Sequence, residues 1–425
     1  MASHYNCVKW RCYLPTFFGS CLYLVTLVSL AADFEVGAQL RIFNSVADPK
    51  KEVLNPALFA SVEESYVLPD KSSISFELYG RYDSQDEERN LVDIRQLKWQ
   101  KNFDNFDITL GYDVIYWGVA ESQQLVNVVN QTDAAEGINV ERKLGQPLLG
   151  INYISDWGNF EFYSLLGFQE RSLPGPDGRL GGIVTVDSDR ALFESNKGDD
   201  HVDFAARWSS HYNGVDIGVS YFSGTSREPD LIFDTSAVIE EIDDILLIPK
   251  YNQVDSYSID AQYISAGFLW KLEWIKRDFK QQADYNALTL GLEYTQVGVF
   301  GTRSDFGWVA EYLYDDRGDS APNAAFESDL FLALRWVQNN LDNNEALFGL
   351  IYDPDSGEKI FSLEYQFSLT DSIKIEIEGL LFEGGQAPAF ELTEVLNALQ
   401  QPDPDNRLFF IQNDDFLGIK LRYYF

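Results

Sequence analysis

Apolar side chains recur at every second position through much of the chain. From Phe34 to Ile42 they alternate with polar residues or glycine, and the same spacing returns from Ile74 to Tyr82 and from Ile373 to Leu381. Successive side chains of a β-strand point to opposite faces, so a period of two indicates strands with one apolar and one polar face. Such strands suit either a soluble sandwich or a wall between lipid and water.

The lengths of the connections between strands favour a wall between lipid and water over a soluble sandwich. Strand segments are expected to begin near residues 34, 58, 72, 91, 106, 149, 159, 202, 215, 254, 268, 285, 305, 328, 346, 359, 373 and 415. Connections after even-numbered segments are mostly short turns, whereas long loops at 118–148, 170–201, 224–253 and 383–414 follow odd-numbered ones. Outer-membrane barrels have short periplasmic turns and long outer loops. The predicted fold is therefore all-β, a transmembrane antiparallel up-and-down β-barrel of about eighteen strands.

Two of these segments are less regular than the others. The segment near residue 58 contains Glu63 and Glu64, and the segment near residue 91 alternates poorly. A barrel of sixteen strands therefore stays open as an alternative.

The first 32 residues have the anatomy of a secretory signal peptide. Lys9 and Arg11 precede an apolar run that ends at Leu30, and small residues follow up to Ala32. A permanent N-terminal membrane helix is the alternative. The expected organisation is a signal peptide at 1–32 and a barrel at 33–425. All three cysteines, Cys7, Cys12 and Cys21, fall in the first part, so the mature chain is expected to lack thiols.

The amino-acid composition limits which partners the chain can bind. Aromatic residues make up 15% of the 425 residues, as in a barrel with aromatic girdles at the membrane interfaces. The formal net charge of −35 argues against nucleic-acid binding, which needs clustered Lys and Arg. It also gives a weak hint of cation preference.

The last nine residues, from Leu417 to Phe425, alternate cleanly and end on an aromatic ring. In this the chain resembles bacterial outer-membrane proteins, which typically end in an amphipathic strand with a terminal aromatic residue. The resemblance implies a place in the bacterial outer membrane, contact with its lipid and lipopolysaccharide, and recognition of the strand ending at Phe425 by the barrel-assembly machinery.

Alternation also assigns charged side chains to the inner face of the wall. The predicted pore-lining residues are Arg41, Glu77, Arg81, Arg95, Asp107, Asp113, Arg207, Arg277, Glu293, Glu311, Arg335, Lys374 and Arg422. Charges at such density require water or counter-charges. They indicate a hydrated pore for a polar solute, or cross-strand ion pairs that merely fill the interior.

The loop at 118–148 is the candidate for a constriction. Leu125, Val128 and Val129 have helix-like spacing, and a loop of this length could fold into the lumen or pack on the rim. The candidate constriction residues are Glu121, Asn127, Asn130, Asp133, Arg142 and Lys143. The string Trp117-Gly118-x-x-Glu121 with Asn127, Asn130 and Asp133 resembles a feature of large porin-like families. The barrel is also similar to the eighteen-strand alginate-export type, a resemblance that implies architecture and no substrate.

Few residues of the sequence indicate a function other than transport. After signal cleavage only His201 and His211 remain, at opposite ends of one predicted strand, so they cannot share a site. His201 with Asp203 at the outer rim resembles the Asp-x-His pair of omptin-like surface proteases. Acidic clusters in the outer loops could bind Ca²⁺, but a solvated acidic surface is the simpler interpretation. We expect no catalytic residue, resident metal or cofactor.

The sequence therefore predicts an outer-membrane channel for passive diffusion of small polar or charged solutes. An apolar-solute uptake barrel, a closed structural or adhesive barrel and an omptin-like rim protease remain alternatives.

Overall fold

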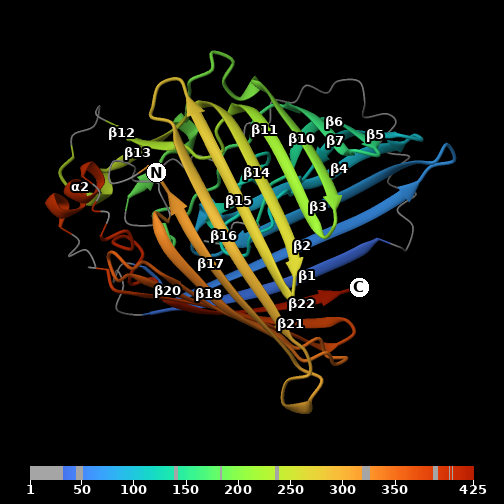
Figure 1. Ribbon diagram of the computed structural model, residues 1–425. Helices are drawn as coiled ribbons and strands as arrows, with labels where there is room; N and C mark the ends of the chain where they lie inside the picture. The colour runs from blue at the N-terminus through green and yellow to red at the C-terminus, as the bar shows by residue number, and fades with distance from the viewer. Residues whose placement is uncertain are drawn as a thin grey trace.

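Eighteen antiparallel strands form one closed barrel (Figure 1). The computed structural model describes residues 32–425 except 45–50, 138–141, 182–183, 235–238, 318–325, 386–390, 402 and 404. The barrel closes because the last strand, β22, pairs with the first, β1, from Phe43↔Phe416 to Glu35↔Tyr424. The predicted fold is thereby confirmed, with eighteen strands rather than sixteen. The expected signal peptide, Ala32 apart, lies outside the described residues.

The barrel strands are β1 (Asp33–Phe43), β2 (Leu54–Val67), β3 (Ser72–Asp83), β4 (Leu91–Asn102), β5 (Phe106–Asp113), β6 (Gln146–Ser155), β7 (Gly158–Leu166), β10 (Val202–Tyr212), β11 (Val215–Thr225), β14 (Gln253–Ser265), β15 (Phe268–Phe279), β16 (Tyr285–Gln296), β17 (Asp305–Asp315), β18 (Ser328–Val337), β19 (Glu345–Tyr352), β20 (Lys359–Thr370), β21 (Ile373–Glu383) and β22 (Phe416–Tyr424). Most begin within two residues of the expected positions. β2 starts at Leu54 and β6 at Gln146, both earlier than expected.

A bulge explains why the segment near residue 91 alternates poorly. Glu77 of β3 pairs with Gln96, and the next residue, Leu78, pairs with Ile94, so Arg95 of β4 has no counterpart. An extra residue shifts the alternation by one position, which is the effect of a β-bulge. The strand is real, but its period of two is interrupted.

Short turns and long loops lie at opposite ends of the barrel. Links such as 213–214, 266–267 and 371–372 have two residues, whereas 114–145, 167–201, 226–252 and 384–415 are long. In Figure 1 the long-loop elements β12 (Asp230–Phe233), β13 (Leu246–Tyr251) and α2 (Leu392–Gln400) gather on the left, away from the C-terminus. Short turns mark the periplasmic end of outer-membrane barrels, so the long loops are at the outer end.

Three outer loops pack into one another. β8 (Thr185–Val186), β9 (Leu192–Phe193), β12 and β13 form a small second sheet. Val184, Ile245, Leu247 and Val395 make a buried apolar cluster that joins loops 167–201, 226–252 and 384–415. No helix in the described part of the chain is long and apolar enough to cross a bilayer.

The outer face of the wall is apolar. Phe34, Leu58, Leu332, Phe348 and Leu421 are among many large apolar side chains that are exposed on it. Each of the eighteen barrel strands shares hydrogen bonds with two neighbours, so the closed wall leaves no strand edge. A closed wall of this kind is one of the two structures able to satisfy backbone polar groups in hydrocarbon.

We predict that Leu332→Arg destabilises the barrel in lipid. Leu332 lies near the middle of β18 and points outward, where a cation near the bilayer midplane costs about 2–4 kcal/mol. Equilibrium unfolding in phospholipid vesicles measures the loss. Tyr263→Arg, on the same outer face but at the periplasmic end of β14, is the control and should cost about 0–1 kcal/mol. Equal losses for the two variants would contradict this placement of the membrane.

Candidate functional site

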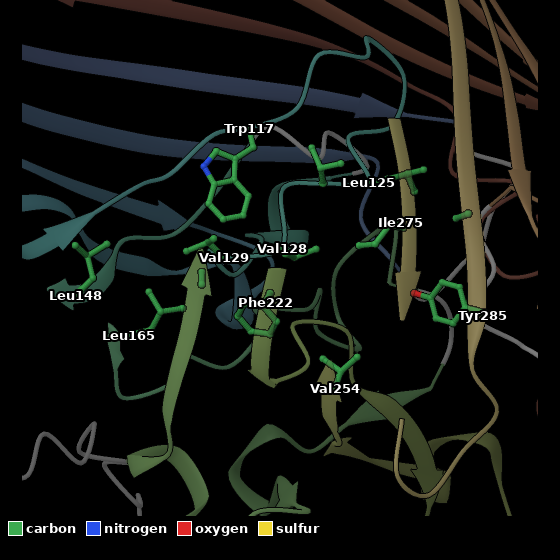
Figure 2. Close-up of a cluster of buried hydrophobic side chains, with 13 residues drawn as sticks. Trp117, Leu125, Val128, Val129, Leu148, Leu165, Phe222, Val254, Ile275 and Tyr285 are labelled. Carbon is green, nitrogen blue, oxygen red and sulfur yellow. The ribbon is translucent and has the colours of Figure 1, made fainter. Parts of the chain in front are cut away.

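Loop 114–145 folds into the barrel. β5 ends at Asp113 and β6 begins at Gln146, and both are short, so the loop leaves and rejoins the wall below the outer rim. Its Trp117, Leu125, Val126, Val128 and Val129 are buried in one apolar cluster with inward side chains of the wall (Figure 2). These wall residues are Leu148, Leu165, Ala205, Phe222, Val254, Ile275, Tyr285 and Ala287. The structure thus places the loop in the lumen, not on the rim.

Two wall carboxylates hold the start of the loop. Glu273 on β15 accepts hydrogen bonds from the backbone N–H groups of Val119, Ala120 and Val126, at 2.5, 2.8 and 3.2 Å. Glu311 on β17 accepts from the N–H groups of Glu121 and Ser122, at 2.8 and 2.9 Å. Because a loop inside a barrel cannot pair its backbone with a strand, inward carboxylates take over that role.

Asn127 and Asn130, two of the candidate constriction residues, organise the loop from within. The Asn127 side chain accepts from the N–H groups of Trp117 and Gly118, at 2.6 and 2.8 Å. Asn130 is fully buried and bonds the backbone of Ile115, Asp113 and Leu144. Both amides are used inside the loop and do not face a passage.

Glu136 anchors the other end of the loop. This buried carboxylate lies 2.7 Å from Arg81, 2.9 Å from Arg89, 3.5 Å from Lys420 and 3.9 Å from Arg41, and it also pairs with Arg142. We call these six residues the Glu136 cluster. Asp133, another candidate, lies beside it and pairs with Arg81 at 2.8 Å. The cluster joins the loop to β1, β3 and β22.

The surrounding cations keep Glu136 ionised. Burial alone would raise the pKa of Glu136, but Arg142, Arg41, Lys420 and Arg81 lower that pKa well below its ordinary value of 4.5. A carboxyl with a depressed folded-state pKa stabilises the fold above its unfolded pKa and loses that contribution as pH falls through the folded one. The anchor should therefore hold throughout the neutral and mildly acidic range.

A polar cavity of about 300 Å³ lies between the loop and the wall from β18 to β22. It is lined by Glu121 and Arg142 of the loop and by wall residues that include Arg335, Glu364, Glu376 and Lys420. Arg335 bonds Glu121 at 2.7 Å and Glu293 at 3.2 Å across this space. The loop therefore fills the lumen unevenly, with its apolar part against β6–β16 and a polar space on the opposite side.

The predicted pore-lining residues all occupy lumen-facing positions. Arg41, Arg81, Asp113, Arg207, Arg277 and Glu311 are buried or nearly so. The others remain partly exposed: Glu77, Arg95, Asp107, Glu293, Arg335, Lys374 and Arg422. Ion pairs are frequent among them, as between Glu77 and Arg95 at 3.1 Å and between Arg207 and Asp260 at 2.6 Å. Pore lining itself stays a prediction.

Lys143, the remaining candidate, lies on the outer side of the loop. Its ammonium donates to the Asn127 carbonyl at 3.1 Å and to the Thr132 hydroxyl at 2.9 Å. The candidate residues of the loop therefore do not converge on a single constriction. Only Glu121 and Arg142 reach the polar cavity.

Sequence reasoning missed the residues that anchor the loop. Glu136 stands in a stretch without strand or helix periodicity, and Arg89 lies in a short connection between β3 and β4. Nothing in the spacing of either residue indicates that they meet. Only the closed barrel, which brings β1, β3 and β22 around the loop, creates the contact.

The two histidines are far from a shared site. His201 bonds Asp203 at 2.7 Å, but the same carboxylate binds Arg227 at 2.7 Å and the Thr225 N–H at 3.0 Å. Asp203 is thus fully used in holding the ends of β10 and β11. His211 pairs with Asp216 at the periplasmic end. Within the described ranges, no three His, Cys, Asp or Glu side chains gather closely enough to hold a metal ion.

We predict that Glu136→Gln loosens loop 114–145. The substitution leaves four buried cations and the partly exposed Arg142 without their shared carboxylate, which should cost about 3–5 kcal/mol of unfolding free energy. Denaturant unfolding of the refolded barrel measures this loss, and protease digestion reports release of the loop. Glu383→Gln, which breaks an exposed pair with Lys359, should cost about 0–1 kcal/mol. A Glu136 variant as stable and protease-resistant as this control would refute the anchor.

Comparison with known proteins rests on structure alone. No model of a known protein family matches the sequence, and no curated protein matches it. Among solved structures, the chain is similar to Wzi, an outer membrane protein of Escherichia coli, at a TM-score of 0.52 and 10% identity, over 95% of this chain and 87% of Wzi.

Two further similarities are weaker. OmpT of Vibrio cholerae in its trimer form gives a TM-score of 0.44 at 10% identity, over 93% of this chain and 98% of OmpT. A mutant of the Rh. blastica porin gives 0.43 at 11% identity, over 93% of this chain and 99% of the porin.

The fold and the wall settle what kind of protein this is. A closed wall of eighteen strands presents an apolar surface outside and charged side chains inside, which fits only a barrel embedded in lipid. The chain is a β-barrel protein of the bacterial outer membrane.

Proposed function

We propose that the protein is a narrow porin-like channel for passive diffusion of small polar or charged solutes. The single observation that carries this proposal is the polar cavity between loop 114–145 and the wall from β18 to β22. Solutes would pass on this side of the loop, because the opposite side is packed with apolar side chains.

Charge placement on the wall supports a wet passage. Glu364 on β20 lies directly opposite Glu378 on β21, and Gln366 lies opposite Glu376. The Glu364 side chain points into the barrel and is nevertheless exposed. Like charges on facing positions destabilise a dry sheet, so neighbouring carboxylates at this place favour a hydrated space.

The size and lining of the cavity favour small solutes. A space of about 300 Å³ is at the lower end of the range of small-molecule sites. Its lining includes Glu121, Glu345, Glu364, Glu376 and Glu378 against Arg142, Arg335 and Lys420. Side chains of both signs around one space orient a polar solute and disfavour an apolar one.

We further propose that export and assembly follow the route of other outer-membrane barrels. Residues 1–32 would be removed as a signal peptide, and the barrel-assembly machinery would read the last strand. Phe425 suits this role because its ring is 71% exposed while its N–H donates to the carbonyl of Phe34 at 3.0 Å. Outer-membrane lipid and lipopolysaccharide would surround the wall. We assign no catalytic role to His201, since Asp203 is used structurally.

A closed barrel that binds a ligand at its outer end is the second candidate function. Wzi is described as a carbohydrate-binding β-barrel involved in capsule assembly. The observation that favours this alternative is the packing of three outer loops into one apolar cluster around Val395 and Ile245. An ordered outer layer could bind a polymer without conducting solutes.

Cysteine labelling tests the proposed passage. Residues 33–425 contain no cysteine, so Gln366→Cys adds a single thiol to the cavity wall. A charged methanethiosulfonate reagent should reach this thiol from water and reduce the single-channel conductance by about half or more, since the added group occupies the passage. Planar bilayers with the refolded barrel give the measurement.

Leu363→Cys is the matched control. Leu363 is on the same strand, but its side chain points outward into lipid, so the same reagent should leave the conductance unchanged. Conductance that does not respond to labelling at Gln366 would remove this passage from the proposal. A barrel that never conducts would favour the closed alternative.

A further inference from the structure

A second group of charges lies on the outer side of loop 114–145. Arg277 on β15 and Arg317 after β17 pair with Glu228 at 3.1 and 3.6 Å. Lys143 of the loop, Arg171 of loop 167–201 and Arg227 after β11 lie within electrostatic range of this group. We call these five cationic residues the basic cluster. They come from five different elements, and none of them lines the polar cavity described above.

Each carboxylate in this region already has a cation. Asp203 pairs with Arg227 at 2.7 Å, Asp315 pairs with Arg317 at 2.6 Å, and Glu228 pairs with Arg277 at 3.1 Å. Within the described ranges, these three carboxylates pair with three of the five cations. The basic cluster therefore has an excess of positive charge in a chain whose formal net charge is −35.

Lys143 and Arg171 account for the excess of positive charge in the basic cluster. Among the described residues, neither forms an ion pair: Lys143 donates only to the neutral oxygens of Asn127 and Thr132. The Nε of Arg171 is buried without a hydrogen-bond partner, and so is the Nη2 of Arg227, whose side chain is 7% exposed. A buried donor without a partner is costly, and a protein normally supplies one or leaves room for a ligand.

The side chains of the basic cluster are not closely packed. The Glu228 side chain at its centre keeps 36% of its surface exposed, and Lys143 and Arg171 are both partly exposed. Burial, together with Arg171, Arg277 and Arg227, lowers the pKa of Lys143 to about 7, although Glu228 opposes the shift. An anion in this space would relieve the same repulsion that lowers the pKa.

The guanidinium groups are held in place before any ligand arrives. Arg317 lies over the ring of Tyr285 at 4.2 Å and Arg277 lies over the same ring at 5.7 Å. Arg227 is fixed by a 2.8 Å bond from its Nε to the Val129 carbonyl. Fixed guanidinium donors suit the oxygens of an oxyanion, which accept two N–H bonds at once.

We propose that the basic cluster is a binding site for an oxyanion group, that is, the carboxylate, phosphate or sulfate group of a small solute. Lys143 and Arg171 would be its main donors, with Arg277 and Arg227 beside them. The inference goes beyond the proposed channel and does not depend on it, because binding at the outer side of the loop needs no conduction.

Sulfate is the probe of choice because it does not titrate near neutral pH. Isothermal titration of the refolded full barrel in detergent at pH 6 should show one site. Arg171→Gln should weaken sulfate binding about tenfold or more, since it removes a donor that makes no ion pair in the fold. Lys143→Met should do the same and should also remove the weakening expected between pH 6 and pH 8, as Lys143 loses its proton.

Lys276→Gln is the matched control. Lys276 is adjacent to Arg277 on β15, but its side chain points to the outer face and pairs with Asp278 at 2.6 Å. Sulfate affinity should change less than about twofold in this variant. No saturable binding by the unchanged protein, or equal affinity in Arg171→Gln and Lys276→Gln, would overturn the inference.

Conduction and binding separate the two proposals. A barrel that binds sulfate but never conducts would refute the channel and support this site. A barrel that conducts but shows no sulfate site would refute this inference alone.

Discussion

Closure of the wall is the constraint on which the rest of the structure depends. In hydrocarbon every backbone N–H and C=O must be paired within the protein, and the pairing of β22 with β1 completes that pairing around the barrel. A closed wall then fixes the alternation, because each strand must present apolar side chains to lipid. The other half of every strand points into the lumen, where the chain places Arg41, Glu273, Glu311 and many other charged groups. Those charges need water, counter-charges or backbone donors. Glu136 is surrounded by counter-charges, whereas Glu273 and Glu311 accept from backbone donors.

Loop 114–145 divides the lumen according to what the wall offers. Against Leu148, Phe222 and Ile275 the wall is apolar, and the loop packs there with Val126 and Val129. On the opposite side the wall is charged, and the loop is anchored by Glu136 and leaves a polar cavity. Two charged regions of different character result: a cavity with excess carboxylates toward β18–β22, and the basic cluster on the outer side of the loop. The large negative net charge of the chain therefore does not describe the local field that a solute would meet.

The sequence predicted the wall well and the interior poorly. Period-two spacing depends only on local geometry, so seventeen of the eighteen strands could be placed to within three residues from spacing and turns, even where the bulge at Arg95 interrupts the pattern. β2 was placed too late because Glu63 and Glu64 obscure its alternation. Loop contacts follow from closure instead, which brings distant strands together. Thus Asn127 and Asn130 were assigned to a constriction although they bond the backbone of their own loop, and Glu136 was missed.

The central proposal is that a water-filled passage runs past a firmly anchored loop. Single-channel recording of the unmodified barrel, residues 33–425 refolded in detergent and inserted into planar bilayers in 1 M KCl (about 3 Å Debye length), tests this most directly. The account predicts discrete steps of one small size that stay open, because the loop narrows the lumen without filling it. Insertion of folded barrels without any step in current would contradict it.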